Sequence, residues 1–303
     1  MGETKEIVIE AGKTVRQIFF MSDIHINNNN EYDDEYRSVF NKLFIKLDQH
    51  QINSDDLVVL VGDILDDGTV MSASCITLVK YFYHELTNRC PVISILGNHD
   101  YKKQTNLLVP SVDYLFPTKH KNIFLLENAI YIYRNIAFGH TRFDSSEVTN
   151  CEQYNDEYMT IALYHGTING CKMENNYIAR TQFNMKNFKD YKFCAFGDVH
   201  RHQFLNKNKT AFYCGSLIMQ KKNEIFEHGI VKLDVKNENI SFHEIENEYK
   251  ILNITIDDGK SNFDINKITT NNTKDKTYKQ MQLTHRWAKE QFEYFEQHYD
   301  AAR

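Results

Sequence analysis

The chain contains short apolar segments that end abruptly in polar residues. FFM at 19–21, LVVLV at 57–61 and VISIL at 92–96 are rich in β-branched and aromatic residues and too short for helices. Such runs predict strands buried on both faces. Residues 31–51 and 72–86, which lie between them, carry apolar positions at helical spacing and predict two helices. Alternation of strand and helix is typical of an α/β layered fold.

The second half of the chain has a looser pattern. Residues 124–140 predict short antiparallel strands, and residues 210–219, 228–237 and 240–249 predict successive strands that complete a second sheet against the first. The character changes near residue 248, where one more strand (251–260) precedes a polar stretch and a helix over 278–299 with one apolar stripe. We therefore expect a main domain over 1–247 and a separate segment over 248–303.

Metal-ligating residue types stand at the ends of five predicted strands. Because sites in such sheets form in the crevice beyond the strand ends, we expect these residues to meet. Asp198, His200 and His202 alternate, so all three would project on one side if their strand continued through them; a polar loop is the alternative. The strand-end residues are Asp23, His25, Asp63, Asn98, His99, Asp100, His165, Asp198 and His200.

This set of ligands indicates a particular class of metal and reaction. Carboxylate, amide and imidazole ligands without thiolates favour Mn²⁺, Fe²⁺ or Zn²⁺ over Ca²⁺. Seven ligands (Asp23, His25, Asp63, Asn98, His165, Asp198 and His200) are too many for one ordinary site, and a carboxylate can bridge two ions. A pair of divalent ions serves phosphoester hydrolysis, because it can polarise the phosphoryl group and stabilise both the attacking and the leaving oxygen.

Composition and charge narrow the setting. A net charge of −6 over 303 residues excludes a generally basic, nucleic-acid-coating surface, so any contact with nucleic acid must be local. The six cysteines form no C-x-x-C pair, which predicts reduced thiols that are mostly buried. The first residues lack the pattern of a signal peptide, and no apolar stretch is long enough to cross a bilayer. We expect an intracellular protein that does not use a membrane.

The motifs at the strand ends resemble those of the calcineurin-like metallophosphoesterases. DIH at 23–25, GDILDD at 62–67, GNHD at 97–100, HG at 165–166 and GDVH at 197–200 match that family's five motifs in order. The resemblance implies a four-layer α/β sandwich, two mixed β-sheets flanked by helices, here with a small C-terminal appendage. It also implies that Asp23, His25, Asp63 and His200 hold one metal, and that Asp63, Asn98, His165 and Asp198 hold the other, with Asp63 as the bridge.

The last motif departs from the family pattern, because GDVH replaces the usual G-H-x-H. An aspartate at 198 can still bind a metal, and its harder oxygen favours Mn²⁺ or Mg²⁺. The alternative is a weakened metal site in a fold reused as a scaffold. GDVHRHQF, the later YCGSLIMQ and YHGTINGCKMENNY are similar to SbcD-type DNA-repair nucleases, especially the branch of phages and large DNA viruses. In that branch the aspartate would be the normal ligand.

The narrower resemblance implies a nuclease that hydrolyses DNA with two divalent ions, Mn²⁺ expected first and Mg²⁺, Fe²⁺ or Zn²⁺ as alternatives. It further implies an SbcC-type ATPase partner, allows a homodimer, and makes 248–303 the start of a capping, DNA-contacting or partner-binding segment. The protein would act in the cytoplasm or where viral or phage DNA replicates.

His99 and Asp100 would be the catalytic pair, because an imidazole oriented by a carboxylate can donate a proton to the leaving oxygen. Two rival readings remain open at this point. The substrate could be a phosphoprotein, a cyclic nucleotide, RNA or a small phosphoester, or the fold could serve as a non-catalytic interaction module.

Overall fold

A computed structural model describes residues 6–10, 12–68, 71–104, 107–110, 122–221, 224, 226–247, 256–257 and 260–261. The chain divides into two compact units, one formed by residues 1–218 with 226–246 and the other by residues 219–225 with 247–303. The first unit contains every strand-end residue named above. The expected boundary between residues 247 and 248 stays a prediction.

A six-stranded mixed sheet forms one half of the first unit. Its order is β15 (Asn239–Glu244), β14 (Gly229–Asp234), β2 (Gln17–Met21), β3 (Leu57–Val61), β4 (Val92–Ile95) and β7 (Ile123–Leu125). Strands β2, β3, β4 and β7 run parallel to one another, and β14 pairs antiparallel with both β2 and β15. Parallel strands bring their carboxyl ends to one edge, and this edge carries three of the motifs.

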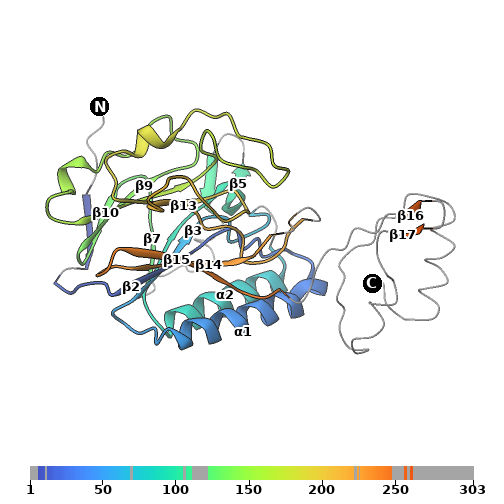
Figure 1. The fold of residues 1–303 in the computed structure, drawn as a ribbon. Coiled ribbons are helices and arrows are strands. Elements are labelled where there is room, and N and C mark those ends of the chain that lie inside the picture. Colours follow the sequence, from blue (N-terminus) through green and yellow to red (C-terminus); the bar gives the residue numbers. More distant parts are fainter. Residues whose placement is uncertain are drawn as a thin grey trace. The chain divides into compact units, whose positions relative to one another are not determined.

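Two helices cover one face of this sheet, as the apolar spacing predicts. They are α1 (Asp33–Gln49) and α2 (Ala73–Thr87), which lie side by side in Figure 1. Tyr36, Phe40 and Leu43 of α1 are buried at i, i+4 and i+7, and Ser72 caps α2 by accepting a hydrogen bond from the Cys75 amide at 3.1 Å. The predicted helices are therefore confirmed.

A seven-stranded mixed sheet forms the other half. Its order is β1 (Glu6–Glu10), β8 (Ile130–Tyr133), β9 (Ile136–Thr141), β10 (Met159–His165), β11 (Phe193–Gly197), β13 (Ala211–Tyr213) and β12 (Gln203–Phe204). Alternate side chains of the two sheets form one apolar core between them, with Phe20, Val59 and Ile93 on one side and Phe138 and Leu163 on the other. Two mixed sheets packed face to face confirm the predicted fold class.

The outer face of the seven-stranded sheet is covered differently from what the family pattern suggests. Its apolar side chains pack against residues between Cys151 and Tyr191, which contain only the short 3₁₀ helices η4 (Glu152–Tyr154) and η5 (Met185–Phe188). Burial of residues such as Phe183 and Phe188 closes this face without a regular helix among the described residues. The fourth layer is therefore mostly irregular.

Two strand predictions were wrong in their sheet assignment. Residues 228–237 and 240–249 do not complete the second sheet, because β14 and β15 extend the first sheet beside β2. Strand β7, at the start of 124–140, also joins the first sheet, parallel to β4. Local sequence predicts the strands but not their long-range partners, which the alternation alone does not encode.

The remaining elements are η1 (Asn30–Tyr32), η2 (Asn98–Asp100), the ribbon β5 (Tyr101–Gln104) with β6 (Leu107–Pro110), and β16 (Ile256–Asp257) with β17 (Lys260–Ser261) in the second unit. The predicted helix over 278–299 lies outside the described residues, as does most of the strand over 251–260. No helix in the described part of the chain is both long and apolar enough to span a membrane. All six cysteines are free and buried, as predicted.

Candidate metal centre

The strand-end residues converge at the carboxyl edge of both sheets. Asp23 and His25 follow β2, Asp63 follows β3, His165 ends β10, and His200 follows β11. These five side chains are all buried, with exposed fractions from 0% to 5%. Two buried carboxylates and three buried imidazoles are thus gathered from four separate strands, so the expected meeting of the motifs is present.

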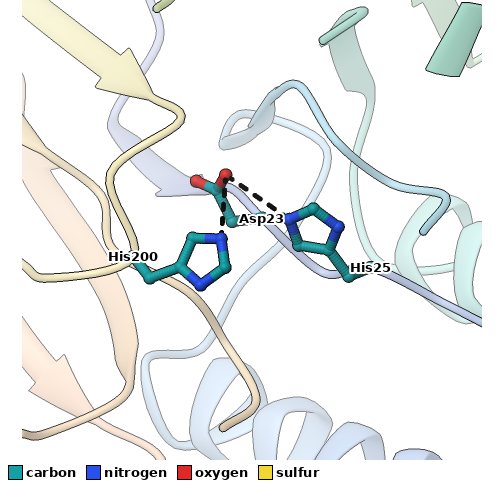
Figure 2. Close-up of side chains that lie close together, drawn as sticks. All are labelled: Asp23, His25 and His200. Atoms are coloured by element: carbon teal, nitrogen blue, oxygen red, sulfur yellow. Dashed lines mark ion pairs between the residues drawn. The ribbon is translucent and has the colours of Figure 1, made fainter. Parts of the chain in front are cut away.

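Asp23 is the meeting point of one group of ligand atoms. Its Oδ1 lies 3.8 Å from His25 Nε2 and 3.9 Å from His200 Nε2. Figure 2 shows both imidazoles directed toward the same carboxylate, one from the loop after β2 and the other from the loop after β11. The ligand atoms of Asp23, His25 and His200 all lie within 4.8 Å of one another. That spacing suits a single cation.

Asp63 is the centre of the second group. Its Oδ2 lies 3.2 Å from His165 Nε2 and 3.6 Å from His25 Nε2, while its Oδ1 accepts a hydrogen bond from the His99 amide at 3.0 Å. Ligand atoms of Asp23, Asp63 and His165 also lie within 4.8 Å of one another. Because Asp63 faces both groups, its position suits a carboxylate that bridges two ions.

The backbone is strained where the ligands stand. Asp23, His25, Asp63 and Asp198 all have positive φ, between 48° and 87°, a region that non-glycine residues seldom adopt. Such conformations cost about 1–3 kcal/mol each and persist only where the surroundings enforce them. Gly97 lets this geometry form, since a Cβ there would lie 2.6 Å from the Asp63 amide and 2.7 Å from His165 Nε2. The left-handed turns direct the carboxylates into the centre.

The buried charges perturb one another. Burial raises the pKa of Asp23, against the opposing effect of His165 and His200. Burial alone would also raise the pKa of Asp63 and lower that of His165. Their mutual attraction overrides burial, so the pKa of Asp63 falls below its ordinary value and that of His165 rises well above its own. The pair therefore favours an anionic Asp63 facing His165, whereas burial disfavours the anionic form of Asp23.

These residues fit a divalent cation. The Nε2 atoms of His25 and His165 are buried and make no hydrogen bond within the described residues, although each faces a carboxylate oxygen. Leaving such atoms unsatisfied is costly, and a metal ion between the imidazoles and carboxylates would satisfy them. His165 Nδ1 lies 2.8 Å from the Val61 carbonyl, a contact that orients the ring with Nε2 toward Asp63.

Asp198, His200 and His202 of the last motif do not project from one strand face. Strand β11 ends at Gly197, and Asp198 turns away with φ of 87°. The Asp198 amide donates to Asp23 Oδ1 at 3.1 Å, while its Oδ2 accepts from Thr167 Oγ1 at 2.6 Å. Thr167 thus holds this carboxylate, and Asp198 is not a member of the groups of described carboxylates and histidines that could hold an ion.

His202 lies apart from the centre. Its ring stacks on Phe242, with centroids 4.2 Å apart and an interplanar angle of 12°, and its Nδ1 lies 2.8 Å from the Tyr213 carbonyl. The alternation of Asp198, His200 and His202 thus reflects no shared face. A packed structural histidine accounts for the third position.

The GNHD loop after β4 gives its residues separate tasks. Asn98 and His99 are exposed, and His99 Nδ1 lies 2.5 Å from the Asp66 carbonyl. Asp100 is fully buried and accepts from the Leu65 and Gly97 amides, each at 2.9 Å. Burial, with a contribution from Asp63, raises the pKa of Asp100 to about 7. These contacts make Asp100 a residue that shapes the loop, whereas the Asp66 carbonyl orients the His99 ring.

Sequence reasoning missed several residues that support the ligands. Ser22 Oγ donates to Asp23, and the Glu174 carboxylate accepts the His200 amide hydrogen at 2.9 Å. Ser216 forms a parallel bridge with Ser22, and its amide donates to the His200 carbonyl at 2.8 Å. Ser216 lies in the YCGSLIMQ segment, whose resemblance to SbcD-type nucleases was the sequence signal for a role near the site.

Two viral proteins are similar in sequence to this chain. The chain is 34% identical over 235 residues to the "Uncharacterized protein R555" of Acanthamoeba polyphaga mimivirus, covering 72% of this chain and 17% of that protein. It is 25% identical over 227 residues to the "Putative phosphoesterase 244L" of Invertebrate iridescent virus 6, covering 72% of this chain and 75% of that protein. The chain thus spans about a sixth of the length of the mimivirus relative.

One solved structure, the nuclease MPE of Pseudomonas putida, matches with a TM-score of 0.29 and 16% identity over 48% of this chain and 59% of that chain. This likeness is too weak to bear on function. The model of the family described as calcineurin-like phosphoesterase matches residues 16–202, which include all five motifs. The chain belongs to the calcineurin-like phosphoesterase family.

Proposed function

We propose that this protein is a two-metal phosphodiesterase that hydrolyses DNA. The observation that carries the proposal is the buried group of two carboxylates and three imidazoles, Asp23, His25, Asp63, His165 and His200, at the carboxyl edge of the sheets. Asn98 and Asp198 would complete the coordination, Asp198 after its carboxylate turns from Thr167. Divalent cations bound there would supply Lewis-acid polarisation of the phosphoryl oxygens and activation of water.

The chain's own residues would position and protonate the substrate. His99 is exposed beside the centre, with its ring 4.9 Å from that of His25 between centroids. With Nδ1 donating to the Asp66 carbonyl, Nε2 is the nitrogen available to the substrate. His99 Nε2 would donate its proton to the leaving oxygen as the phosphoester bond breaks. Asp100 would hold the loop that presents this imidazole.

The DNA specificity rests on the motifs that resemble SbcD-type nucleases. Because the net charge of the chain is −6, its contacts with DNA phosphates would be local. We further propose Mn²⁺ as the working metal, because aspartate and histidine together suit it. An SbcC-type ATPase partner, a homodimer, an intracellular location at sites of DNA replication and a DNA- or partner-contacting role for residues 248–303 are parts of the same proposal.

The test is cleavage of end-labelled linear double-stranded and single-stranded DNA with Mn²⁺, Mg²⁺ or chelator, with Asp198→Ala in parallel. A chromogenic phosphodiester serves as a second substrate. The proposal expects Mn²⁺-dependent DNA cleavage that is strongly reduced in the variant. Hydrolysis of the chromogenic ester without DNA cleavage would move the function to another phosphoester, and no hydrolysis of either substrate under any metal would contradict enzymatic activity of this chain.

A further inference from the structure

A hairpin beside the last motif has no role in the proposed chemistry. It runs from Gly170 to Ala179, immediately after His165 and Thr167. Its backbone pairs Gly170 with Ala179 at 2.9 Å and Met173 with Tyr177 at 2.8 Å, and Lys172 bridges Ile178 in antiparallel fashion. This pairing makes residues 170–179 a hairpin, named here the rim hairpin.

The rim hairpin is fastened to the segment that carries His200. The Gln203 side-chain amide pairs with the Lys172 backbone, accepting from its N–H at 2.9 Å and donating to its carbonyl at 2.8 Å. The Arg201 guanidinium donates to Asn176 Oδ1 at 3.1 Å, and Glu174 accepts from the His200 amide at 2.9 Å. Four hydrogen bonds thus couple the hairpin to three residues of the H-R-H-Q sequence, 200–203.

The rim hairpin combines buried residues with two that are largely exposed. Cys171 and Ala179 are buried in the apolar cluster outside the seven-stranded sheet. Tyr177 and Ile178, by contrast, are 58% and 52% exposed. Four large hydrophobic side chains are more than half exposed in the described part of the chain, and two of them are these neighbours. The Tyr177 ring is therefore an exposed aromatic side chain on a hairpin that is fastened beside His200.

The surroundings favour nucleic acid as the occupant. Tyr177 is the only aromatic side chain among those four, and exposed aromatic rings bind unpaired bases by stacking. Exposed Arg180, three residues after Tyr177, and half-buried Arg201, which donates to Asn176 of the hairpin, add positive charge that suits the phosphates of a nucleic acid. Glu174, the acidic residue of the hairpin, is already engaged by the His200 amide.

We propose that the rim hairpin is a substrate-recognition element in which Tyr177 stacks on an unpaired nucleobase of the strand whose phosphodiester lies at the metal centre. This inference rests on the proposed nuclease function and adds the feature of the substrate that is read. Arg201 and Gln203 are positioning residues, since they fix the hairpin relative to His200.

The test uses the full chain with Mn²⁺ and two strands of equal length, an oligothymidylate and an oligomer of abasic deoxyribose phosphates. Tyr177→Ala should raise KM for the oligothymidylate about tenfold, because base stacking on an aromatic ring is worth that order of affinity. The kcat should change little, since the contact is the same in the ground and transition states. On the abasic strand the KM of the variant should equal that of the wild type.

Two further measurements test whether the Tyr177 ring itself makes the contact and whether metal binding is unchanged. Tyr177→Phe should restore the wild-type KM, because the ring and not the hydroxyl makes the contact. The stoichiometry of Mn²⁺ binding, measured by calorimetry, should be the same in all three proteins. An equal rise in KM on both strands, a Tyr177→Phe variant as impaired as Tyr177→Ala, or no effect of either substitution would overturn the inference while leaving the nuclease function standing. A wild type that hydrolyses only a chromogenic ester would overturn both.

Discussion

Strand β3 has a buried aspartate at each end, Asp56 just before it and Asp63 two residues after it, and the two carboxylates have opposite surroundings. Asp56 is fully buried and receives Arg16 in a bidentate contact, with N–O distances of 2.9 and 2.6 Å, together with the Asn53 amide at 2.9 Å. Asp63 is 2% exposed and faces imidazoles instead of a lysine or arginine.

The difference separates a structural charge from a functional one. A buried carboxylate paired with a guanidinium is satisfied within the chain and needs nothing else. Asp63 and Asp23 face imidazoles and stand on strained backbone, so their environment suits a divalent cation. The amino end of β3 therefore carries a structural ion pair, whereas its carboxyl end carries a candidate metal ligand.

Two buried histidines at the carboxyl edge of the seven-stranded sheet make the same contrast. His165 has carboxylates beside it, which raise its pKa well above the ordinary value despite burial. His140, on the neighbouring strand β9, has no carboxylate among its principal influences, and burial lowers its pKa to about 4. Burial disfavours the charged imidazole in both places, and the local carboxylates decide the outcome.

Asp63→Asn should have the largest effect, because it removes the residue that faces both ligand groups. We expect Mn²⁺-dependent phosphodiester hydrolysis to fall by more than about a hundredfold, the upper range for losing even an outer partner of a metal ligand. In the wild type, Mn²⁺ at about a hundred times its Kd should raise the free energy of unfolding by about 2.7 kcal/mol, and in the variant this gain should largely vanish. Urea titrations with and without chelator measure it.

The matched control is Asp56→Asn at the other end of the same strand, in which the Mn²⁺-dependent gain should persist. If Asp63→Asn kept both hydrolysis and the Mn²⁺-dependent gain, the carboxyl edge would not be a metal centre. Loss of the gain in Asp56→Asn would equally erase the distinction between the two ends.

His99→Ala tests the exposed imidazole beside the centre. Loss of a general acid costs about 10²- to 10⁴-fold in rate, so kcat should fall by that order while Mn²⁺ stoichiometry is retained. The choice of substrate tests whether His99 is a general acid. An ester with a good leaving group such as p-nitrophenolate needs no proton, so its kcat should fall far less. Equal loss on DNA and on the activated ester would assign His99 to metal binding, a role that its proximity to His25 and Asp63 permits.

Much of the fold could be predicted because short buried parallel strands and amphipathic helices have strong local patterns. The apolar runs preceding Asp23 and Asp63 and the helical spacing in α1 lie where expected. Strand β1 (Glu6–Glu10) was missed, since its short EIVIE segment lies at a sheet edge, with Val8 59% exposed. The placement of β14 and β15 depends on pairing with β2 more than 200 residues earlier, which no local pattern specifies.

Within the site, the convergence of five strand ends was predictable from chain order and sheet geometry. The orientation of Asp198 was not, because it depends on Thr167, 31 residues away in sequence. Nor could the sequence reveal that the Asp66 carbonyl and not the Asp100 carboxylate meets the His99 ring. Residue types at strand ends are encoded locally, but side-chain hydrogen-bond partners follow from the assembled loops.

Acidification should lower the free energy of unfolding, because His140 is buried in its neutral form. The pKa of His140 is about 4 when folded and about 6.5 when unfolded, so the unfolded state binds protons first as pH falls. His140 therefore contributes fully above about pH 6.5, and about 3 kcal/mol of the free energy of unfolding should be lost between pH 6.5 and 4. Denaturant titrations at several pH values, in chelator, should show that the free energy of unfolding falls less steeply with decreasing pH in His140→Gln than in the wild type. Equal pH dependence in the two proteins would contradict the role of His140.

The smallest expected effect concerns the structural end of β3. Asp56→Asn should lower the free energy of unfolding by about 2 kcal/mol, the range for hydrogen bonds to charged groups, because Arg16 and the Asn53 amide lose their anionic acceptor. The loss stays moderate since Arg16 is 44% exposed and water can solvate it.

Asp55→Asn is the matched control. Its carboxylate is 52% exposed and pairs only loosely, with Lys13 at 3.9 Å and Arg134 at 3.6 Å, so the substitution should lower the free energy of unfolding by less than about 1 kcal/mol. Urea titration gives both values, and hydrolysis per folded molecule should match the wild type. A change in hydrolysis without a change in stability would mean that charge at the amino end reaches the metal centre, and the two ends of β3 would then not be independent.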